Sequence, residues 1–161
     1  MERRPNVDPG LTLRRAVATD APTLADLYLL ARRAAEPTIP PIAHTNANVH
    51  VWFREVVLPA YQTWIAEADG HVAAVLVLNG DDLDQLYVHT DRTGGGISSR
   101  LVQHAKDLRP SGLSLWTFQS NRGAQRFYER HGFVAVERTD GSTNEERSPD
   151  VRYVWSHIRR Q

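Results

Sequence analysis

The sequence predicts an α/β protein of the α+β type, with a mixed, mostly antiparallel central sheet of about seven strands and helices on both faces. The first observation is the order of hydrophobic patterns, which runs strand, helix, helix, three strands, helix, strand, helix, strand, strand. The second is the segment 71–78, HVAAVLVL, which is apolar almost without interruption. Such a strand is typical of the centre of a sheet that is covered on both faces.

The first strand and the first helix follow from a change of hydrophobic period. Apolar and polar residues alternate in residues 11–16, which predicts a strand. Residues 21–35 then carry apolar side chains at helical spacing. We expect Asp20 to cap this helix with its side chain and Pro22 to lie in the first turn.

A stiff loop separates the first helix from the second. Residues 36–45 contain three prolines, which disfavour helical geometry. Thr45 or Asn46 can cap a helix over residues 47–57, and Pro59 is expected just beyond its end. The expected apolar stripe of this helix consists of Val49, Trp52, Phe53 and Val56.

The rest of the chain predicts a three-strand meander followed by alternating helices and strands. Asp69-Gly70 is a tight hairpin turn inside the meander, and Asn121 and Gly132 can cap and close the last helix. The expected elements are three strands within residues 61–89, a helix over 97–109, a strand over 113–118, a helix over 121–133, and strands over 133–139 and 151–157.

The length and composition of the chain limit the classes of function that it can have. The chain has 161 residues, and we expect a flexible lead-in over residues 1–10 and a single domain over residues 11–161. Lys plus Arg equals Asp plus Glu, at 19 each, so no net charge attracts nucleic acid or an anionic membrane. There is no cysteine for a disulfide or a thiol nucleophile. No apolar run approaches the roughly 20 residues of a membrane helix, so we expect a cytoplasmic protein.

The segment QLYVHTDRTGGGISSRL, residues 85–101, contains three consecutive glycines between a strand and a helix. A glycine-rich turn at a helix N-terminus points unpaired amides at one spot and suits a phosphate. A plain glycine-rich connection is the alternative interpretation. A P-loop matches poorly because no Gly-Lys-Ser/Thr follows, and a dinucleotide fingerprint would have Ser99 in place of its third glycine.

Three segments resemble the GNAT acyltransferases, which use acetyl-CoA to acylate amines. The segment LDQLYVHTDRTGGGISSRLVQHA resembles the fourth strand of that family and its Gln/Arg-x-x-Gly-x-Gly/Ala loop. The segment LWTFQSNRGAQRFYERHGFVAV is similar to the Asn-x-x-Ala and Phe-Tyr-x-x-x-Gly-Phe pattern, and LTLRRAVATDAPTLADLY to the opening strand and helix. Where the family has Gln/Arg and a final Gly/Ala, this chain has Thr93 and Ser98, with Arg92 one residue earlier.

The resemblance implies an acetyl-CoA site between splayed fourth and fifth strands. The backbone of the fourth strand would pair with the pantetheine arm, and the glycine-loop amides would hold the pyrophosphate. The amide near Val88 can also polarise the thioester oxygen. The expected cofactor-binding residues are Leu86, Tyr87, Val88, Thr93, Gly94, Gly95, Gly96, Ile97, Ser98, Ser99, Asn121, Ala124, Phe127 and Tyr128.

The resemblance also implies catalytic roles. Tyr128 matches the tyrosine that protonates the leaving thiolate, although its position equally suits a core aromatic. Asp84 and Asp82 lie where the family often carries a carboxylate that acts as the base or binds the cationic substrate, and either also suits a turn. His44 and Glu145 are candidate acceptor-binding residues in the loops expected to line the acceptor pocket. Glu145 belongs to the run Asn144-Glu145-Glu146, which could receive an amine there, and a surface histidine and a solvated charged loop are the alternatives.

These expectations add up to an N-acetyltransferase that moves acetyl from acetyl-CoA directly to a primary amine of a small molecule or peptide. A non-catalytic acyl-CoA sensor and a dinucleotide-binding module are the alternatives. No pair of histidines shares a face at metal-ligand spacing, so no metal is expected. By analogy, a homodimer is possible through the apolar final strand.

Overall fold

A computed structural model of the chain describes residues 10–157. These residues form one seven-stranded sheet in the order β1-β2-β3-β4-β5-β7-β6, in which only β4 and β5 run parallel. The mostly antiparallel mixed sheet that the sequence predicts is therefore confirmed. The strands are β1 (Leu11–Arg15), β2 (Gln62–Ala68), β3 (His71–Asn79), β4 (Asp82–Val88), β5 (Leu113–Phe118), β6 (Val134–Thr139) and β7 (Asp150–Trp155).

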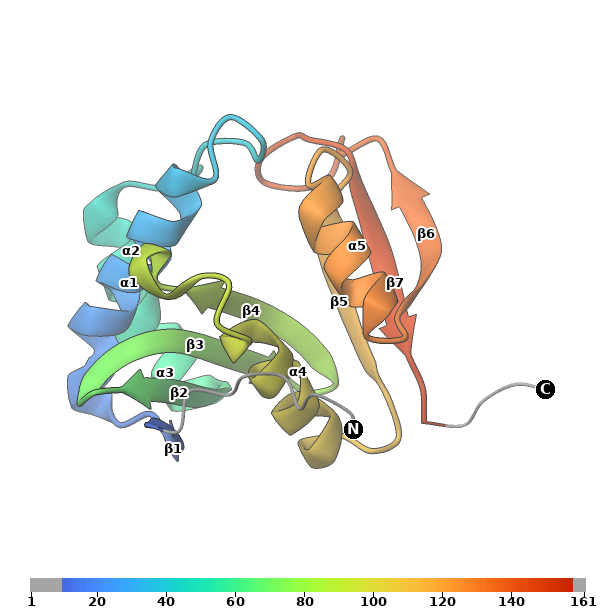
Figure 1. Cartoon of the computed structure of the whole chain (residues 1–161). Coiled ribbons are helices and arrows are strands. Elements are labelled where there is room, and N and C mark those ends of the chain that lie inside the picture. The colour runs from blue at the N-terminus through green and yellow to red at the C-terminus, as the bar shows by residue number, and fades with distance from the viewer. Residues whose placement is uncertain (1–9, 158–161) are drawn as a thin grey trace.

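The helices lie between the strands in the predicted order. Figure 1 shows β1–β4 with α1–α4 as one half of the molecule and β5–β7 with α5 as the other. The main helices are α1 (Ala21–Ala34), α2 (Asn46–Trp52), α4 (Ile97–Leu108) and α5 (Arg122–Arg130). Short helical segments are η1 (Ala18–Asp20), η2 (Phe53–Val57), α3 (Leu58–Ala60) and η3 (Thr90–Arg92).

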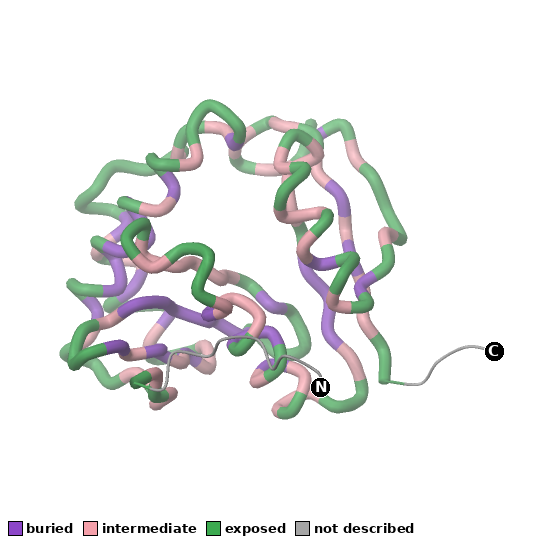
Figure 2. The backbone as a smooth tube through the Cα atoms, in the orientation of Figure 1, coloured by how far each residue is buried: buried purple, intermediate pink, exposed green. Residues whose placement is uncertain are grey.

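Two hydrophobic clusters cover opposite faces of β2 and β3. On β3, Leu76 faces a cluster with α4, whereas its neighbours Val75 and Val77 face a second cluster with α1, α2 and η2. Successive side chains of a strand point to opposite faces, so both clusters draw on the same apolar run. Figure 2 shows β3 buried along most of its length. The central position predicted for this strand is confirmed.

Asp20 does not cap α1 through its side chain, which corrects the sequence prediction. Its carboxylate instead accepts two hydrogen bonds from Arg14, each of 2.9 Å, and one from the Val17 amide at 2.7 Å. The guanidinium offers a charged, forked partner that a helix amide does not match. Thr45 does cap α2, because its hydroxyl accepts a hydrogen bond from the Asn48 amide at 3.1 Å.

The second helix runs past its predicted end. After Trp52 the helix takes the wider π form, in which the Leu58 amide donates a hydrogen bond to the Phe53 carbonyl five residues back. The chain then continues as the short helix α3, which contains Pro59. The wider turn changes which residues of this helical segment face the core. Val57 is fully buried, whereas Val56, which was predicted on the apolar stripe, is 38% exposed.

The final strand does not lie at the edge of the sheet. β7 pairs with β5 on one side and β6 on the other, so its backbone hydrogen bonds are used within the chain. Strand pairing with a second copy through β7 is therefore excluded, which corrects the proposed dimer contact. Within residues 10–157 none of the helices is long and apolar enough to cross a bilayer.

Candidate active site

The central feature of the molecule is a cleft between β4 and β5. The two parallel strands share a single paired position, Asp82 with Ser114, and then diverge toward their carboxyl ends. At the closed end the Ser114 hydroxyl donates to the Asp82 carboxylate, and the Ser114 amide donates to the Asp81 carbonyl at 3.0 Å. The space between the strands is a cleft of about 460 Å³. Figure 1 shows how β4 and β5 run apart between the two halves of the sheet.

The glycine loop lies at one mouth of this cleft. Gly94 and Gly96 have φ angles of 81° and 80°, a region that favours glycine, and Gly96 is the N-cap of α4. The first amides of a helix lack partners within the helix, so those of α4 are available to a ligand. A second cavity of about 310 Å³ lies here and adjoins the cleft at Val88, Thr93 and Ser98.

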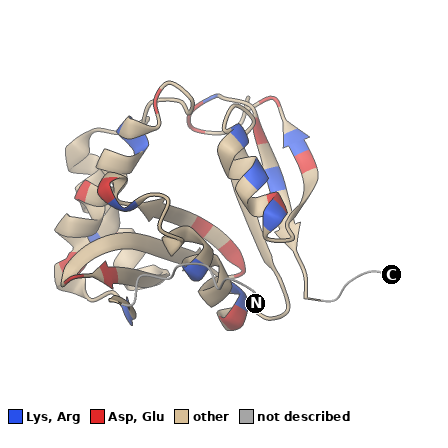
Figure 3. Cartoon of the chain, viewed as in Figure 1, with Lys and Arg blue, Asp and Glu red and all other residues tan. Residues whose placement is uncertain are grey.

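Arginines stand around this second cavity. Arg92 and Arg130 both line it, and Arg92 is bound to Asp69 at 3.0 Å. Figure 3 shows basic residues spaced along α5 and acidic residues in the first half of β4. The Thr93 hydroxyl donates to the Thr90 carbonyl at 3.4 Å and so belongs to the loop itself. Amides at a helix N-terminus and cations together fit the phosphates of a CoA molecule.

Tyr128 lines the cleft from α5 and has its aromatic ring in the core. Its ring packs edge-on against Phe127 at 5.1 Å and Phe133 at 5.4 Å between centroids. Burial raises the pKa of the Tyr128 phenol above its ordinary value, and the nearby Tyr87 adds to the effect. The phenol is therefore protonated throughout the neutral range. Among the described residues its hydroxyl has no hydrogen-bond partner.

The two aspartates of β4 differ in position. Asp84 sits at an irregularity in the pairing of β3 and β4, between Leu83 and Gln85, and lines the cleft. Partial burial raises the pKa of Asp84, although the residue keeps an exposed surface. A hydrogen bond from Gln85 opposes this shift, and the charge of Asp82 adds to it. Asp82 joins the two strands at their closed end and is not among the residues that line the cleft.

Asn121 caps α5 and also lines the cleft. Its side-chain oxygen accepts a hydrogen bond from the Ala124 amide at 3.1 Å. The Nδ2 group of Asn121 is not used in this cap and keeps its two donors. Capping and contact with a ligand in the cleft are therefore compatible.

A third cavity, of about 510 Å³, lies between α1, α2 and the loop that joins β6 to β7. We call it the acceptor pocket. Tyr28, Trp52 and Val49 form its apolar wall, with the rings of Tyr28 and Trp52 5.8 Å apart. Burial raises the pKa of Tyr28 to about 12.

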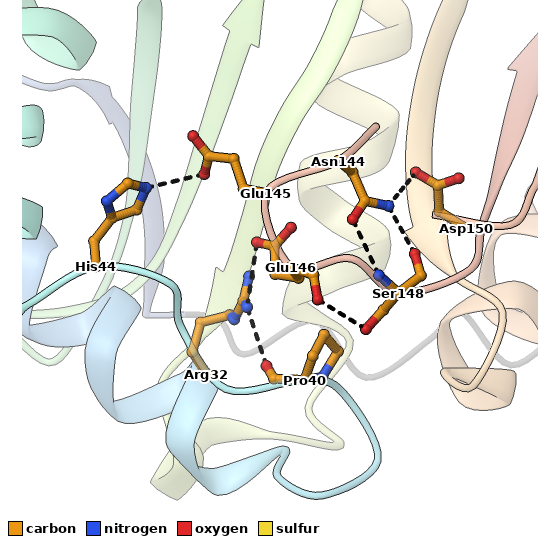
Figure 4. Close-up of polar contacts among 8 residues, drawn as sticks. All are labelled: Arg32, Pro40, His44, Asn144, Glu145, Glu146, Ser148 and Asp150. Carbon is orange, nitrogen blue, oxygen red and sulfur yellow. Dashed lines mark hydrogen bonds and ion pairs between the residues drawn. The ribbon is translucent and has the colours of Figure 1, made fainter. Parts of the chain in front are cut away.

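Two adjacent glutamates, Glu145 and Glu146, connect the β6–β7 loop to α1 and to the α1–α2 loop through charged contacts. His44 Nε2 lies 3.0 Å from a Glu145 oxygen, so the structure brings together two residues that the sequence analysis named separately. Arg32 Nη2 lies 3.7 Å from a Glu146 oxygen. Figure 4 shows both pairs, which join the α1–α2 region to the β6–β7 loop.

The sequence analysis did not select Arg32, Gln85 or Arg130 as site residues, and it named Glu146 only as part of the charged run Asn144-Glu145-Glu146. Arg32 and Gln85 line both the cleft and the acceptor pocket, and Arg32 is 5% exposed. A signal for Arg32 exists in the sequence, because it follows Leu24 and Tyr28 at intervals of four on the buried side of α1. An arginine at a buried helical position indicates a partner or a ligand.

Most other predicted residues lie where the cleft and the glycine-loop cavity meet. Leu86, Tyr87, Val88, Thr93, Ser98, Asn121 and Ala124 line the cleft, and Gly94, Gly96, Ile97, Ser98, Ser99 and Phe127 line the adjoining cavity. Gly95 lines neither cavity. Within residues 10–157, His, Asp and Glu side chains form no group of three that could hold a metal ion.

Comparison with known proteins gives a consistent family assignment. Residues 59–135 match the family model described as "Acetyltransferase (GNAT) domain". The peptidyl-lysine N-acetyltransferase YjaB of Salmonella typhimurium is 33% identical over 84 residues, which are 52% of this chain and 57% of that protein. The chain thus spans little more than half the length of this relative. The peptidyl-lysine N-acetyltransferase YiaC of Escherichia coli is 27% identical over 126 residues, 78% of this chain and 84% of that protein.

Solved structures share the fold. Apo YjaB from Escherichia coli has a TM-score of 0.73 at 21% identity, covering 90% of this chain and 97% of that one. A structure from Corynebacterium glutamicum, titled as histone acetyltransferase HPA2 and related acetyltransferase, has a TM-score of 0.75 at 16% identity, covering 94% and 99%. The YncA structure from Salmonella typhimurium, solved with its cofactor acetyl-CoA, has a TM-score of 0.65 at 18% identity, covering 94% and 96%.

Proposed function

We propose that this chain, which belongs to the GNAT acetyltransferase family, transfers the acetyl group of acetyl-CoA directly to a primary amine of a small molecule or peptide. The observation that carries the proposal is the divergence of β4 from β5 after one paired position. It opens a cleft with Tyr128 in its wall and the glycine loop at its mouth.

The proposed cofactor contacts use both sides of this opening. Beyond Asp82, the edge of β4 that faces β5 has no strand partner, so the backbone of Leu86 to Val88 is free to bond the amides of the pantetheine arm. The amides at the start of α4 would hold the pyrophosphate, with Arg130 from the opposite wall adding positive charge. Acetyl-CoA supplies a thioester, whose carbonyl carbon the amine attacks.

Tyr128 is the proposed general acid. When the C–S bond breaks, the sulfur needs a proton, and the phenol can donate one from the cleft wall. The raised pKa of Tyr128 keeps this proton in place at neutral pH. The nitrogen loses its second proton as the amide forms, and this proton restores the Tyr128 phenol, directly or through water.

Asp84 is the proposed proton acceptor for the amine. An alkylammonium must lose one proton before its nitrogen attacks, and the raised pKa of Asp84 makes this carboxylate a stronger base than an ordinary aspartate. The proton passes directly or through one water molecule. Asp82 is proposed to act indirectly, because it fixes the closed end of the cleft and raises the pKa of Asp84 by its charge.

A lysine side chain is the acceptor that we favour. The apolar wall of the acceptor pocket suits the methylene chain of lysine, and Glu145 and Glu146 supply negative charge. The names of two relatives, both peptidyl-lysine N-acetyltransferases, support this choice. His44 is then a substrate-side residue through its contact with Glu145.

The proposal is tested by incubating the purified protein with acetyl-CoA and a panel of amines that includes lysine peptides. Release of free thiol is measured together with the binding of acetyl-CoA by calorimetry. We expect saturable binding and amine-dependent thiol release. Binding without turnover on any amine would favour a non-catalytic acyl-CoA sensor, and absence of binding would overturn the proposal.

A further inference from the structure

Glu146 occupies a junction that no other glutamate reaches among residues 10–157. It lines the cleft between β4 and β5, the acceptor pocket, and a groove of about 480 Å³ on the side of Trp116 and Phe118. Glu145, its neighbour in the chain, lines the acceptor pocket and this groove but not the cleft. A ligand that passes from the acceptor pocket toward the thioester in the cleft therefore passes Glu146.

The Glu146 carboxylate retains unused acceptor capacity. Its side chain is 18% exposed, and its charged contact is Arg32 Nη2 at 3.7 Å, longer than a hydrogen bond. No other described residue donates a hydrogen bond to this carboxylate. A largely buried carboxylate with unfilled lone pairs binds a donor strongly, because water competes poorly there.

The loop around Glu146 is held by its own hydrogen bonds. Asn144 Nδ2 donates to the Ser148 carbonyl at 2.7 Å and to Asp150 at 3.2 Å. The Ser148 hydroxyl donates to the Glu146 carbonyl at 3.2 Å. Figure 4 shows this network on one side of Glu146 and Arg32 on the other. The backbone that carries the carboxylate is therefore fixed independently of any ligand.

Arg32 is fixed on the opposite side. Its side chain is 6% exposed, and Nη2 donates to the Pro40 carbonyl at 3.2 Å. The guanidinium carbon lies 5.8 Å from the ring centroids of both Tyr28 and Phe118. A guanidinium held between two rings and a carbonyl sets where the facing carboxylate lies without occupying its oxygens.

We propose that Glu146 binds the ammonium group of the acceptor as it approaches the cleft, and that Arg32 is the positioning residue of this carboxylate. The inference rests on the proposed function and assigns the acceptor as a cationic primary amine. Glu145 is a weaker candidate because its side chain is 69% exposed and pairs with His44 at 3.0 Å. The pocket lining holds two carboxylates, Glu145 and Glu146, and one guanidinium, Arg32, with His44 beside Glu145.

The test compares Glu146→Gln with Glu145→Gln, its neighbour in the chain. Glu137→Gln is the matched control, because Glu137 is exposed on β6 and lines neither the cleft, the acceptor pocket nor the groove. The probes are Nα-acetyl-lysine amide and its norleucine counterpart, which lacks the ammonium group. We expect Glu146→Gln to raise the KM for the lysine probe on the order of 10- to 100-fold, the range of a hydrogen bond to a charged group. We expect kcat of Glu146→Gln at saturation to stay within about threefold of wild type. Glu145→Gln should raise KM less than Glu146→Gln does, and the control Glu137→Gln should leave KM within about twofold of wild type.

Calorimetry supplies a second readout without turnover. We expect the wild-type protein to bind the lysine probe and not the norleucine probe, and Glu146→Gln to lose this discrimination while its Kd for CoA is unchanged. Arg32→Gln should raise the KM for the lysine probe, and Arg32→Lys should restore most of it with kcat unchanged. A purely structural role of Arg32 would instead lower the melting temperature and kcat together.

The outcomes separate this inference from the proposed function. If the wild-type protein acetylates the lysine probe and Glu146→Gln leaves its KM within twofold, the assignment of Glu146 is overturned and the proposed function stands. The same holds if Glu145→Gln produces the larger rise in KM. If the wild-type protein neither binds acetyl-CoA nor releases thiol, both proposals fall.

Discussion

Replacing Tyr128 by phenylalanine removes one oxygen atom from the cleft wall and leaves the ring. The ring contacts with Phe127 and Phe133, at 5.1 and 5.4 Å, remain available. The lost hydroxyl has no hydrogen-bond partner among the described residues, so no group is left unpaired. We therefore expect the free energy of unfolding to change by less than about 1 kcal/mol.

The expected loss is in the chemical step. A positioned general acid contributes about 10²- to 10⁴-fold to a rate, so we expect kcat of Tyr128→Phe to fall by about 10²-fold or more, which corresponds to about 3 kcal/mol of activation free energy. The Kd for acetyl-CoA should change little, because the ring still lines the cleft. Thiol release under saturating amine and acetyl-CoA measures kcat, and thermal unfolding monitors the fold.

The pH dependence provides a further check on this role. The pKa of Tyr128 is raised above its ordinary value, so the wild-type phenol stays protonated up to at least about pH 10. We expect no decline of wild-type kcat from ionisation of Tyr128 between pH 7 and about pH 9. The reasoning is refuted if Tyr128→Phe keeps kcat within threefold of wild type across this range with an unchanged melting temperature.

Three further predictions concern the glycine loop, the first strand and the core. Gly96→Ala forces a side chain onto a φ of 80°, so it should lower the free energy of unfolding by about 1–2 kcal/mol and weaken CoA binding in calorimetry. Gly95→Ala is the control, because its added Cβ would meet only the Arg92 carbonyl at 3.7 Å, and it should change CoA binding little. The hydrogen bonds from Arg14 lower the pKa of Asp20, so its stabilisation is present above its unfolded pKa of about 3.9 and is lost as the pH falls through the lower folded pKa. Asp20→Asn should thus be less stable than wild type by about 1–2 kcal/mol at pH 7 in urea unfolding, and a gap that does not begin to narrow as the pH falls below about 3.9 would contradict this. Leu101→Ala removes a fully buried side chain of α4 and should lower the unfolding free energy by about 2–5 kcal/mol, where a loss under 1 kcal/mol would show that the site collapses without a cavity.

The sequence predicted the secondary structure closely because the spacing of apolar residues along a short segment shows which face of a helix or strand is buried. The apolar run of β3 and the caps at Thr45 and Asn121 were recognised from neighbouring residues, and the structure confirms them. The sequence prediction was wrong where a distant group competes with a local one. Asp20 binds Arg14 rather than the helix amides, and β7 pairs on both of its edges.

The same distinction between local and distant residues applies to the candidate site. The glycine loop and the Tyr128 segment were identified from the sequence because each is a contiguous stretch whose chemistry depends on residue type and spacing. The resemblance also predicted the splayed strands, which the single pairing of Asp82 with Ser114 makes concrete.

What the sequence by itself determined is the order of elements, the resemblance to the GNAT family and a glycine-rich turn at a helix N-terminus. Only the tertiary structure decided which charges meet. Arg32 and Glu146 are 114 residues apart in the chain, and no local pattern relates them. They meet because the parallel pair β4 and β5 diverges, and the α1–α2 region and the β6–β7 loop contact each other across the opening. The spacing of apolar side chains shows which face of an element is buried. Which of Glu145 and Glu146 lines the cleft depends instead on how distant segments of the folded chain meet around it.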